Sequence, residues 1–177
     1  RGVSQCASCD APLLRGKPVV VVGGGDSALQ EALALARIVS RVTILTSGAA
    51  LTAQDSFVER VAGHPEIDIR FNAIIEEIIG DNVVTGVRYR DPAGEKEIPA
   101  DGVFVFIGMQ PNTAFLNGLL ATGKISVDPE MRTGLPGVFA AGTLRAQAAC
   151  RAIASAGDGK IAALAADRYL TDGGWAS

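Results

Sequence analysis

The chain has 177 residues, of which 48% are hydrophobic and 20% charged, and its formal net charge is −3. This globular composition excludes intrinsic disorder, because disordered chains lack the apolar content that offsets the entropy of ordering. The 16 Lys and Arg residues show no excess over 19 Asp and Glu residues, so no nucleic-acid partner is expected. No apolar run approaches the roughly 20 residues that span a bilayer, so no membrane association is expected.

The first chemical motif is Cys6-Ala7-Ser8-Cys9-Asp10, a C-x-x-C followed by a carboxylate. Two thiols at this spacing form a reversible disulfide, and Asp10 is placed to exchange a proton with the leaving thiolate. The alternatives are a zinc half-site and two inert buried thiols. Structural zinc needs four ligands, and beyond this pair the chain offers only Cys150 and His64, so no metal is expected. His64 itself reads as a solvated turn residue.

A strand–helix–strand unit follows the cysteine pair. The run from Val19 to Val22 is β-branched throughout and is closed by glycines, which indicates a fully buried parallel strand. Asp26 suits the N-cap of a helix over Ser27–Ser40, and Val42–Leu45 forms the next strand. The sequence therefore predicts an α/β, Rossmann-like domain.

The turn between that strand and helix fits the dinucleotide motif G-x-G-x-x-A. Its residues are Gly23, Gly24, Gly25, Asp26, Ser27 and Ala28. Glycines permit the tight turn and a close approach of the pyrophosphate, while Ala28 permits close packing of helix on strand. The plain alternative is a glycine-rich turn with no ligand. After the second strand, Thr46 and Ser47 can touch the ribose of either coenzyme, so the motif predicts NADP or NAD without distinguishing them.

The next hundred residues complete this domain and begin another. A helix is expected over Ala53–Ala62, and a strand over Val103–Ile107 ends the domain. Between them, turn residues separate short strands that predict an antiparallel excursion, at 67–71, 73–79, 83–90 and 95–98. The segment Pro111-Asn112-Thr113 marks a boundary, giving domains 1–113 and 114–177.

The second domain has too few predicted strands to make a sheet of its own. Strands are expected at Lys124–Val127 and Val138–Ala141, followed by an Ala-rich helix from about Ala152 or Gly159 to Leu170. We therefore expect this segment to be part of a domain that is completed by other residues.

Four motifs in order along the chain resemble the low-molecular-weight thioredoxin reductase family. The first two are the C-x-x-C-D motif and the glycine motif, the latter followed by Glu31. The third is the segment 100–108, ending in Ile107 and Gly108, with Pro111-Asn112-Thr113. The fourth comprises 136–142 and 155–159, which resemble the family's C-terminal flavin segment.

The resemblance implies a fold and a reaction. It implies a pyridine-nucleotide domain inserted into a split FAD domain, of which this chain holds the C-terminal part and lacks the N-terminal segment. It also implies electron transfer from NAD(P)H through FAD to Cys6 and Cys9, and then to the disulfide of a thioredoxin-like protein. Ile107 and Gly108 would lie beside the nicotinamide, and the flavin would contact Gly142, Thr143, Arg151 and Ala152. A cytoplasmic homodimer is expected.

Several positions depart from the family pattern. The family places arginines for the 2′-phosphate at the positions of Ser47, Gly48 and Thr52, and an aspartate at the position of Thr143. Its Arg-Gln-Ala flavin motif falls on Cys150-Arg151-Ala152. These changes keep two other readings open: a non-catalytic or redox-sensing nucleotide-binding module that has lost its flavin, and a flavin-linked reductase for another acceptor.

Overall fold

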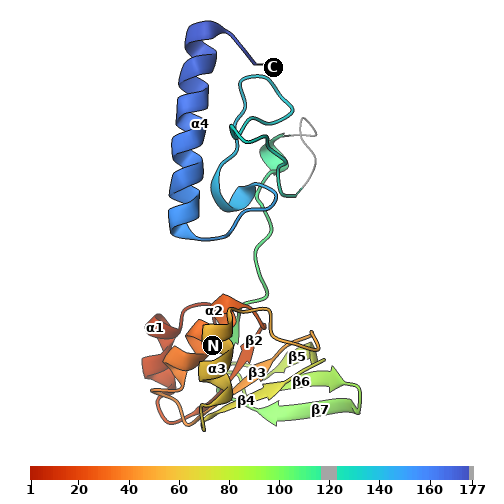
Figure 1. Ribbon diagram of the computed structural model, residues 1–177. Coiled ribbons are helices and arrows are strands. Elements are labelled where there is room, and N and C mark those ends of the chain that lie inside the picture. Colours follow the sequence, from red (N-terminus) through yellow and green to blue (C-terminus); the bar gives the residue numbers. More distant parts are fainter. Residues whose placement is uncertain (117–122, 176–177) are drawn as a thin grey trace. The chain divides into compact units, whose positions relative to one another are not determined.

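The computed structural model describes residues 1–116 and 123–175 (Figure 1). The chain divides into two compact units, Arg1–Gly108 and Met109–Ser177. The division falls a few residues before the predicted boundary at Pro111–Thr113. That residues 1–113 and 114–177 are two functional domains stays a prediction.

The first unit is built on a parallel sheet of five strands. Its order is β1-β8-β2-β3-β4, and each neighbouring pair is parallel. The strands are β1 (Val3–Ser4), β2 (Pro18–Val22), β3 (Arg41–Leu45), β4 (Ile67–Arg70) and β8 (Gly102–Val105). The predicted α/β fold is thus confirmed.

The two faces of this sheet are covered by different layers. Val19, Val21 and Ile44 pack with the helices on one face. Val20, Leu45 and Val103 pack on the other against a three-stranded antiparallel sheet (Figure 1). The covering helices are α1 (Ala7–Asp10), α2 (Asp26–Leu35) and α3 (Asp55–Ala62), and the covering strands are β5 (Ile74–Ile79), β6 (Gly86–Asp91) and β7 (Gly94–Pro99). Side-chain alternation along each buried strand supplies both cores.

Three predictions made from the sequence for this unit are wrong. The strand at 67–71 is not part of the antiparallel excursion, because β4 pairs with β3 in the parallel sheet. The helix over Ser27–Ser40 ends at Leu35, where the chain turns through hydrogen bonds to the Leu35 carbonyl before β3. Its N-cap is Gly25 rather than Asp26. Strand β1 was not predicted, because two residues carry no periodicity.

The second unit contains little sheet. Its elements are the short 3₁₀ turns Ala114–Leu116 and Gly142–Leu144 and the long helix α4 (Ala152–Asp172). The expected strands at Lys124–Val127 and Val138–Ala141 are wrong as continuous strands, since only the isolated bridges Ile125–Arg145 and Arg132–Phe139 form there. These segments are extended but find no partner strand among the described residues. The predicted C-terminal helix is confirmed, beginning at Ala152, and Gly173 closes it in a left-handed conformation.

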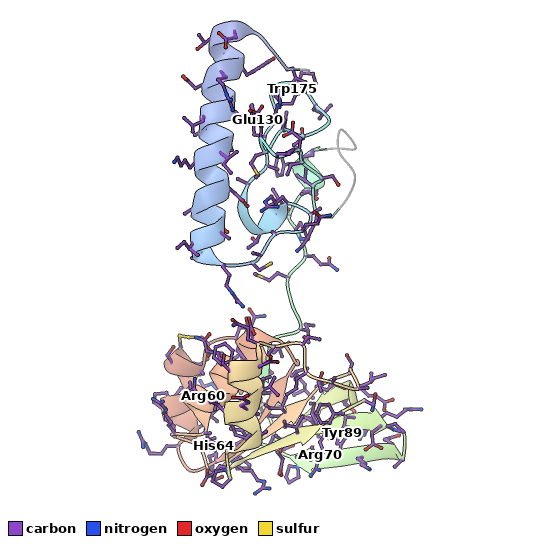
Figure 2. All side chains as sticks on the ribbon, viewed as in Figure 1. Arg60, His64, Arg70, Tyr89, Glu130 and Trp175 are labelled. Carbon is purple, nitrogen blue, oxygen red and sulfur yellow. A yellow bond between two sulfur atoms is a disulfide. The ribbon has the colours of Figure 1, made fainter. Side chains whose placement is uncertain are left out.

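An ion pair and a ring cluster hold this unit together. Arg145 donates to both carboxylate oxygens of Asp158, at 2.5 and 2.9 Å, and the buried Gly142 N–H donates to Asp158 at 3.1 Å. Trp175 meets the rings of Phe139 and Tyr169 edge-on, each at 5.1 Å (Figure 2). Asp158 thereby ties α4 to the Gly142 turn.

This ion pair predicts a pH dependence of stability. The hydrogen bond from Arg145 holds the pKa of the Asp158 carboxyl below its ordinary value of 3.8, against the opposing effect of burial. A carboxyl with a lowered folded-state pKa stabilises the fold above its unfolded pKa, and this contribution is lost as the pH falls through the folded value. We expect the difference in melting temperature between wild type and Asp158→Asn to be largest well above the ordinary pKa of 3.8 and to shrink as the pH falls below it.

The measurement is thermal unfolding followed by the fluorescence of Trp175, the single tryptophan of the chain. Asp167→Asn is the matched control, because Asp167 is an exposed carboxylate on the same helix. A wild-type advantage over Asp158→Asn that stays constant as the pH falls below 3.8 would contradict the assignment.

Candidate functional site

The residues of the first unit that have predicted chemical roles lie at the carboxyl edge of the parallel sheet. The cysteine motif follows β1, the glycine loop follows β2, and Ile107 and Gly108 follow β8. Because β8 pairs with both β1 and β2, these three segments leave neighbouring strands at the same edge. Thr46 and Ser47 leave the same edge after β3. This edge is where ligands bind in open parallel sheets.

Cys6 and Cys9 form a disulfide, with their Cα atoms 5.3 Å apart. Cys6 is the N-cap of α1, and its sulfur accepts a hydrogen bond from the Cys9 N–H at 3.2 Å. The Cys9 residue is exposed and Cys6 is half-buried. The two cysteines are therefore not a buried pair.

Side chains from two other elements, β1 and α2, hold this motif in place. Ser4 on β1 accepts the Cys6 N–H at 3.0 Å and donates to the Asp10 carboxylate at 2.5 Å. Glu31 on α2 accepts the Ala7 N–H at 2.8 Å. Glu31 thus contacts the disulfide segment, and the Asp10 carboxylate bonds to Ser4. Sequence reasoning missed Ser4, because a lone serine two residues before a cysteine carries no pattern.

At Gly23 and Gly24 the loop backbone lies so close to its neighbours that a side chain would clash with them. Gly23 has φ +133°, and a Cβ there would lie 2.3 Å from the Phe106 carbonyl oxygen. A Cβ on Gly24 would lie 2.6 Å from the Thr46 hydroxyl, whereas one on Gly25 would meet only Thr52, at 3.7 Å. Ala28 is fully buried, as close packing of α2 on the sheet requires. The contact between Gly23 and Phe106 also brings Ile107 and Gly108 next to the loop.

The segment before α3, residues 52–54, holds the glycine loop in position through hydrogen bonds. No sequence pattern predicted these contacts. The Thr52 N–H donates to the Gly24 carbonyl at 2.8 Å. The Asp26 carboxylate accepts the Gln54 N–H at 2.7 Å and the Gln54 side-chain amide at 3.2 Å. Asp26 therefore ties the start of α2 to the segment before α3, which explains why it is not the N-cap.

These residues fit a dinucleotide. The side-chain-free surface of Gly24 and Gly25 and the first turn of α2 present backbone N–H groups, which suit a pyrophosphate. Thr46 is buried and supports Gly24, while Ser47 is exposed. Neither position carries a charge that distinguishes a phosphate from a hydroxyl on the ribose.

A hollow of about 440 Å³ opens beside the disulfide. Ala7 and Ser8, which precede Cys9, line it together with α2 and α3. Arg37 and Arg60 bring positive charge to its lining; Arg60 is labelled in Figure 2. The disulfide therefore borders a mixed apolar and cationic surface.

The predicted flavin residues lie in the second unit. Gly142 is buried, with its N–H engaged by Asp158, while Thr143, Arg151 and Ala152 are exposed. Arg151 is the N-cap of α4, and its own side chain makes no capping hydrogen bond. The N–H groups in the first turn of a long helix fit an electron-rich ring edge or a phosphate. Thr143 offers a single hydroxyl there.

Other sequence candidates do not join either site. His64 is half-buried, and its Nδ1 accepts the Glu66 N–H at 3.4 Å. Cys150 is an exposed free thiol in the second unit. Among the described residues no group of three or more His, Cys, Asp or Glu could hold a metal ion, and no described helix is both long and apolar enough to cross a bilayer.

Comparisons with known proteins agree with this arrangement. The family model described as pyridine nucleotide-disulphide oxidoreductase matches residues 1–159. The chain is 43% identical over 174 residues to a thioredoxin reductase of Treponema pallidum, covering 96% of this chain and 57% of that protein. It is 41% identical over 175 residues to an NADH dehydrogenase of Bacillus subtilis, covering 96% of this chain and 34% of that protein.

The structural comparison gives the same result. The crystal structure of Lactococcus lactis thioredoxin reductase matches with a TM-score of 0.91 at 34% identity, covering 97% of this chain and 59% of that one. The chain thus spans little more than half the length of the thioredoxin reductases it matches. With the sheet order, the disulfide and the glycine loop in place, the chain belongs to the pyridine nucleotide-disulphide oxidoreductase family and matches the low-molecular-weight thioredoxin reductases over part of their length.

Proposed function

We propose that this chain acts in a thioredoxin-reductase-like flavoprotein, an NAD(P)H-dependent disulfide reductase. The Cys6–Cys9 pair would receive electrons from NAD(P)H through FAD and pass them to the disulfide of a thioredoxin-like protein. The observation that carries the proposal is a disulfide at the same sheet edge as the glycine loop. As the resemblance implies, we also propose a cytoplasmic homodimer.

The first unit would bind the nicotinamide coenzyme and the second unit would bind the flavin. Gly23 to Ala28 would hold the coenzyme pyrophosphate, with Thr46 and Ser47 near its ribose and Ile107 and Gly108 near its nicotinamide. FAD, when bound, supplies the two-electron relay between the coenzyme and the disulfide. In the second unit Gly142, Thr143, Arg151 and Ala152 would hold the flavin.

The exchange with the acceptor needs only the dithiol form of Cys6 and Cys9. One thiolate attacks an acceptor sulfur, forming a mixed disulfide and releasing the other acceptor sulfur as a thiolate. The second cysteine then attacks its partner sulfur, which restores the Cys6–Cys9 disulfide and leaves the acceptor as a dithiol. Two electrons pass to the acceptor, and Asp10 is the nearby group proposed to exchange a proton with the leaving thiolate.

A nucleotide-binding or redox-sensing module without a flavin is the second candidate. It is favoured by Thr143 and Arg151, which stand where the family has an aspartate and a glutamine. It shares the nucleotide and disulfide chemistry, so only the flavin and the electron path separate the two candidates.

The deciding experiment is the visible absorption spectrum of the purified chain after incubation with excess FAD and removal of free flavin. The flavoprotein proposal predicts a retained flavin band that is bleached by NADH or NADPH under anaerobic conditions. A bound flavin that neither coenzyme reduces would favour the second candidate, whereas a protein that stays colourless shows only that this chain alone does not hold FAD. Apo-flavodoxin, incubated with its own flavin and freed of the excess in the same way, is the positive control for flavin uptake.

The cysteine pair predicts a reversible two-electron couple. Equilibration in glutathione buffers, followed by alkylation and mass spectrometry, should show two thiols titrating together in wild type and in Cys150→Ser. In Cys9→Ser no intramolecular couple should remain, and reduction of a protein disulfide by the pre-reduced chain should fall by at least about 100-fold. Turnover retained in Cys9→Ser would overturn the dithiol mechanism.

The glycine loop predicts a loss of coenzyme binding on a minimal change. Gly24→Ala places a methyl group against Thr46 and in the path of the pyrophosphate, so NADH and NADPH affinity should fall at least about tenfold. Coenzyme fluorescence titration measures this. Gly63→Ala is the control in the same unit, because its Cβ would meet only the Glu59 carbonyl oxygen, at 3.5 Å. Equal affinities in both variants would count against the loop as the coenzyme site.

A further inference from the structure

The Ser4 hydroxyl joins the two ends of the cysteine motif. Ser4 is the last residue of β1 and pairs with Phe104 of β8, so the parallel sheet sets its position. Its oxygen accepts the Cys6 N–H at 3.0 Å, and its O–H donates to Oδ2 of Asp10 at 2.5 Å. Asp10 ends the short helix α1, yet its carboxylate is thereby held at the Cys6 end, where that helix begins.

Ser4 is the one group of the described residues that binds the Asp10 carboxylate. Asp10 is also the N-cap of the 3₁₀ turn Ala11–Leu14, but its side chain makes no capping hydrogen bond there. Within residues 1–116 and 123–175, no Lys or Arg side chain forms an ion pair with it. The orientation of this carboxylate therefore depends on the Ser4 hydroxyl.

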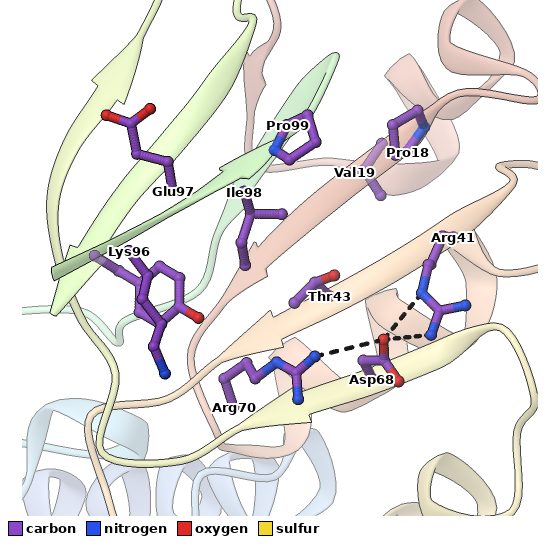
Figure 3. A pocket seen from close by; sticks show the side chains of 11 residues that line it. Pro18, Val19, Arg41, Thr43, Asp68, Arg70, Lys96, Glu97, Ile98 and Pro99 are labelled. Carbon is purple, nitrogen blue, oxygen red and sulfur yellow. Dashed lines mark hydrogen bonds and ion pairs between the residues drawn. The ribbon is translucent and has the colours of Figure 1, made fainter. Parts of the chain in front are cut away.

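The cations of the hollow between the two sheets do not compensate Asp10. This hollow has a volume of about 540 Å³, and Arg41 and Arg70 line it (Figure 3). The Asp68 carboxylate accepts from Arg41 Nε at 2.9 Å and lies 4.0 Å from Arg70. The hollow lies on the face of the parallel sheet that the antiparallel strands cover, whereas α1 packs on the other face through the buried Ala7. These charges are balanced among themselves and lie apart from the cysteine motif.

The Ser4 hydroxyl also has a partner for the uncharged form of Asp10. Its oxygen lies 3.4 Å from the Cys6 carbonyl oxygen, which is a second acceptor for the same O–H. When Asp10 is protonated, its carboxyl O–H can donate to the serine oxygen while the serine O–H turns to that carbonyl. A hydroxyl oxygen accepts two hydrogen bonds, here from Cys6 and Asp10. One serine therefore holds Asp10 in both charge states, as a group that gains and loses a proton requires.

We propose that Ser4 is a positioning residue for proton exchange at the dithiol. The proposal rests on the proposed function, in which Asp10 exchanges a proton during disulfide exchange. The Asp10 carboxylate takes the thiol proton of one cysteine, whose sulfur attacks the acceptor disulfide and breaks its S–S bond. Asp10 then passes that proton to the acceptor sulfur that leaves. The proton of the second cysteine reaches the other acceptor sulfur in the same way, which leaves an acceptor dithiol and the Cys6–Cys9 disulfide. Ser4 acts only through Asp10.

Single-turnover oxidation of the pre-reduced full chain by bis(2-hydroxyethyl) disulfide tests the proposal. The remaining thiols are alkylated and counted by mass spectrometry, and every variant carries Cys150→Ser, which removes the third thiol. We expect Ser4→Ala to slow the reaction about tenfold at pH 7. At about pH 9.5 the loss should shrink to less than about twofold, because a free cysteine thiol has a pKa of about 8.5 and ionises there without a base. Ser4→Thr keeps the hydroxyl and should stay within about threefold of wild type.

The double variant Ser4→Ala/Asp10→Asn shows whether Ser4 acts through Asp10. We expect it to react no more slowly than Asp10→Asn alone, whereas independent effects of the two residues would multiply. Asp10→Asn, which leaves Ser4 in place, should show the same dependence of the loss on pH. A change that only disturbs the fold has no reason to follow the ionisation of the thiols.

Ser56→Ala is the matched control, because Ser56 is an exposed serine on α3. It should leave the rates at both pH values unchanged. The proposal is overturned if Ser4→Ala has no effect, if it slows the reaction equally at both pH values, or if the double variant multiplies the two losses. If the wild-type dithiol reduces the probe at neither pH, the proposed disulfide reductase function fails, and this inference fails with it.

Discussion

The parallel pairing of β8 with both β1 and β2 is the constraint on which the candidate site depends. Residues 3–4 form only a two-residue strand, yet their register against Val103 and Phe104 fixes where the chain emerges before Cys6. The same strand β8 runs beside β2 from Val19 to Val22, so the glycine loop emerges two strands away. The disulfide and the glycine loop therefore lie at the same sheet edge, separated by the single strand β8.

Local hydrogen bonds convert that topology into a defined geometry. Glu31 connects α2 to the disulfide segment, and Thr52 connects the segment before α3 to Gly24. Both bonds use a backbone N–H as donor, so they fix main-chain position and leave the cysteine sulfurs and the loop surface open. A rigid frame with open reactive groups is what a site for successive ligands needs.

The two units differ in how complete they are. The first has two cores, one on each face of its sheet, and a parallel sheet is stable only when both faces are covered. The second has extended segments joined by single bridges, and a long helix that exposes Ile153, Leu164 and Leu170. Its order among the described residues rests on polar ties such as Arg145–Asp158 and on the rings around Trp175.

The sequence by itself determined the α/β unit, the glycine loop, the cysteine motif and the C-terminal helix. Each of these is local: periodicity, glycine placement and motif spacing lie within about twenty consecutive residues. Tertiary structure alone decided that β4 joins the parallel sheet and that Asp26 binds Gln54 instead of capping its helix. These outcomes depend on contacts between residues distant in sequence, and no local pattern encodes which distant strand or side chain will be the partner.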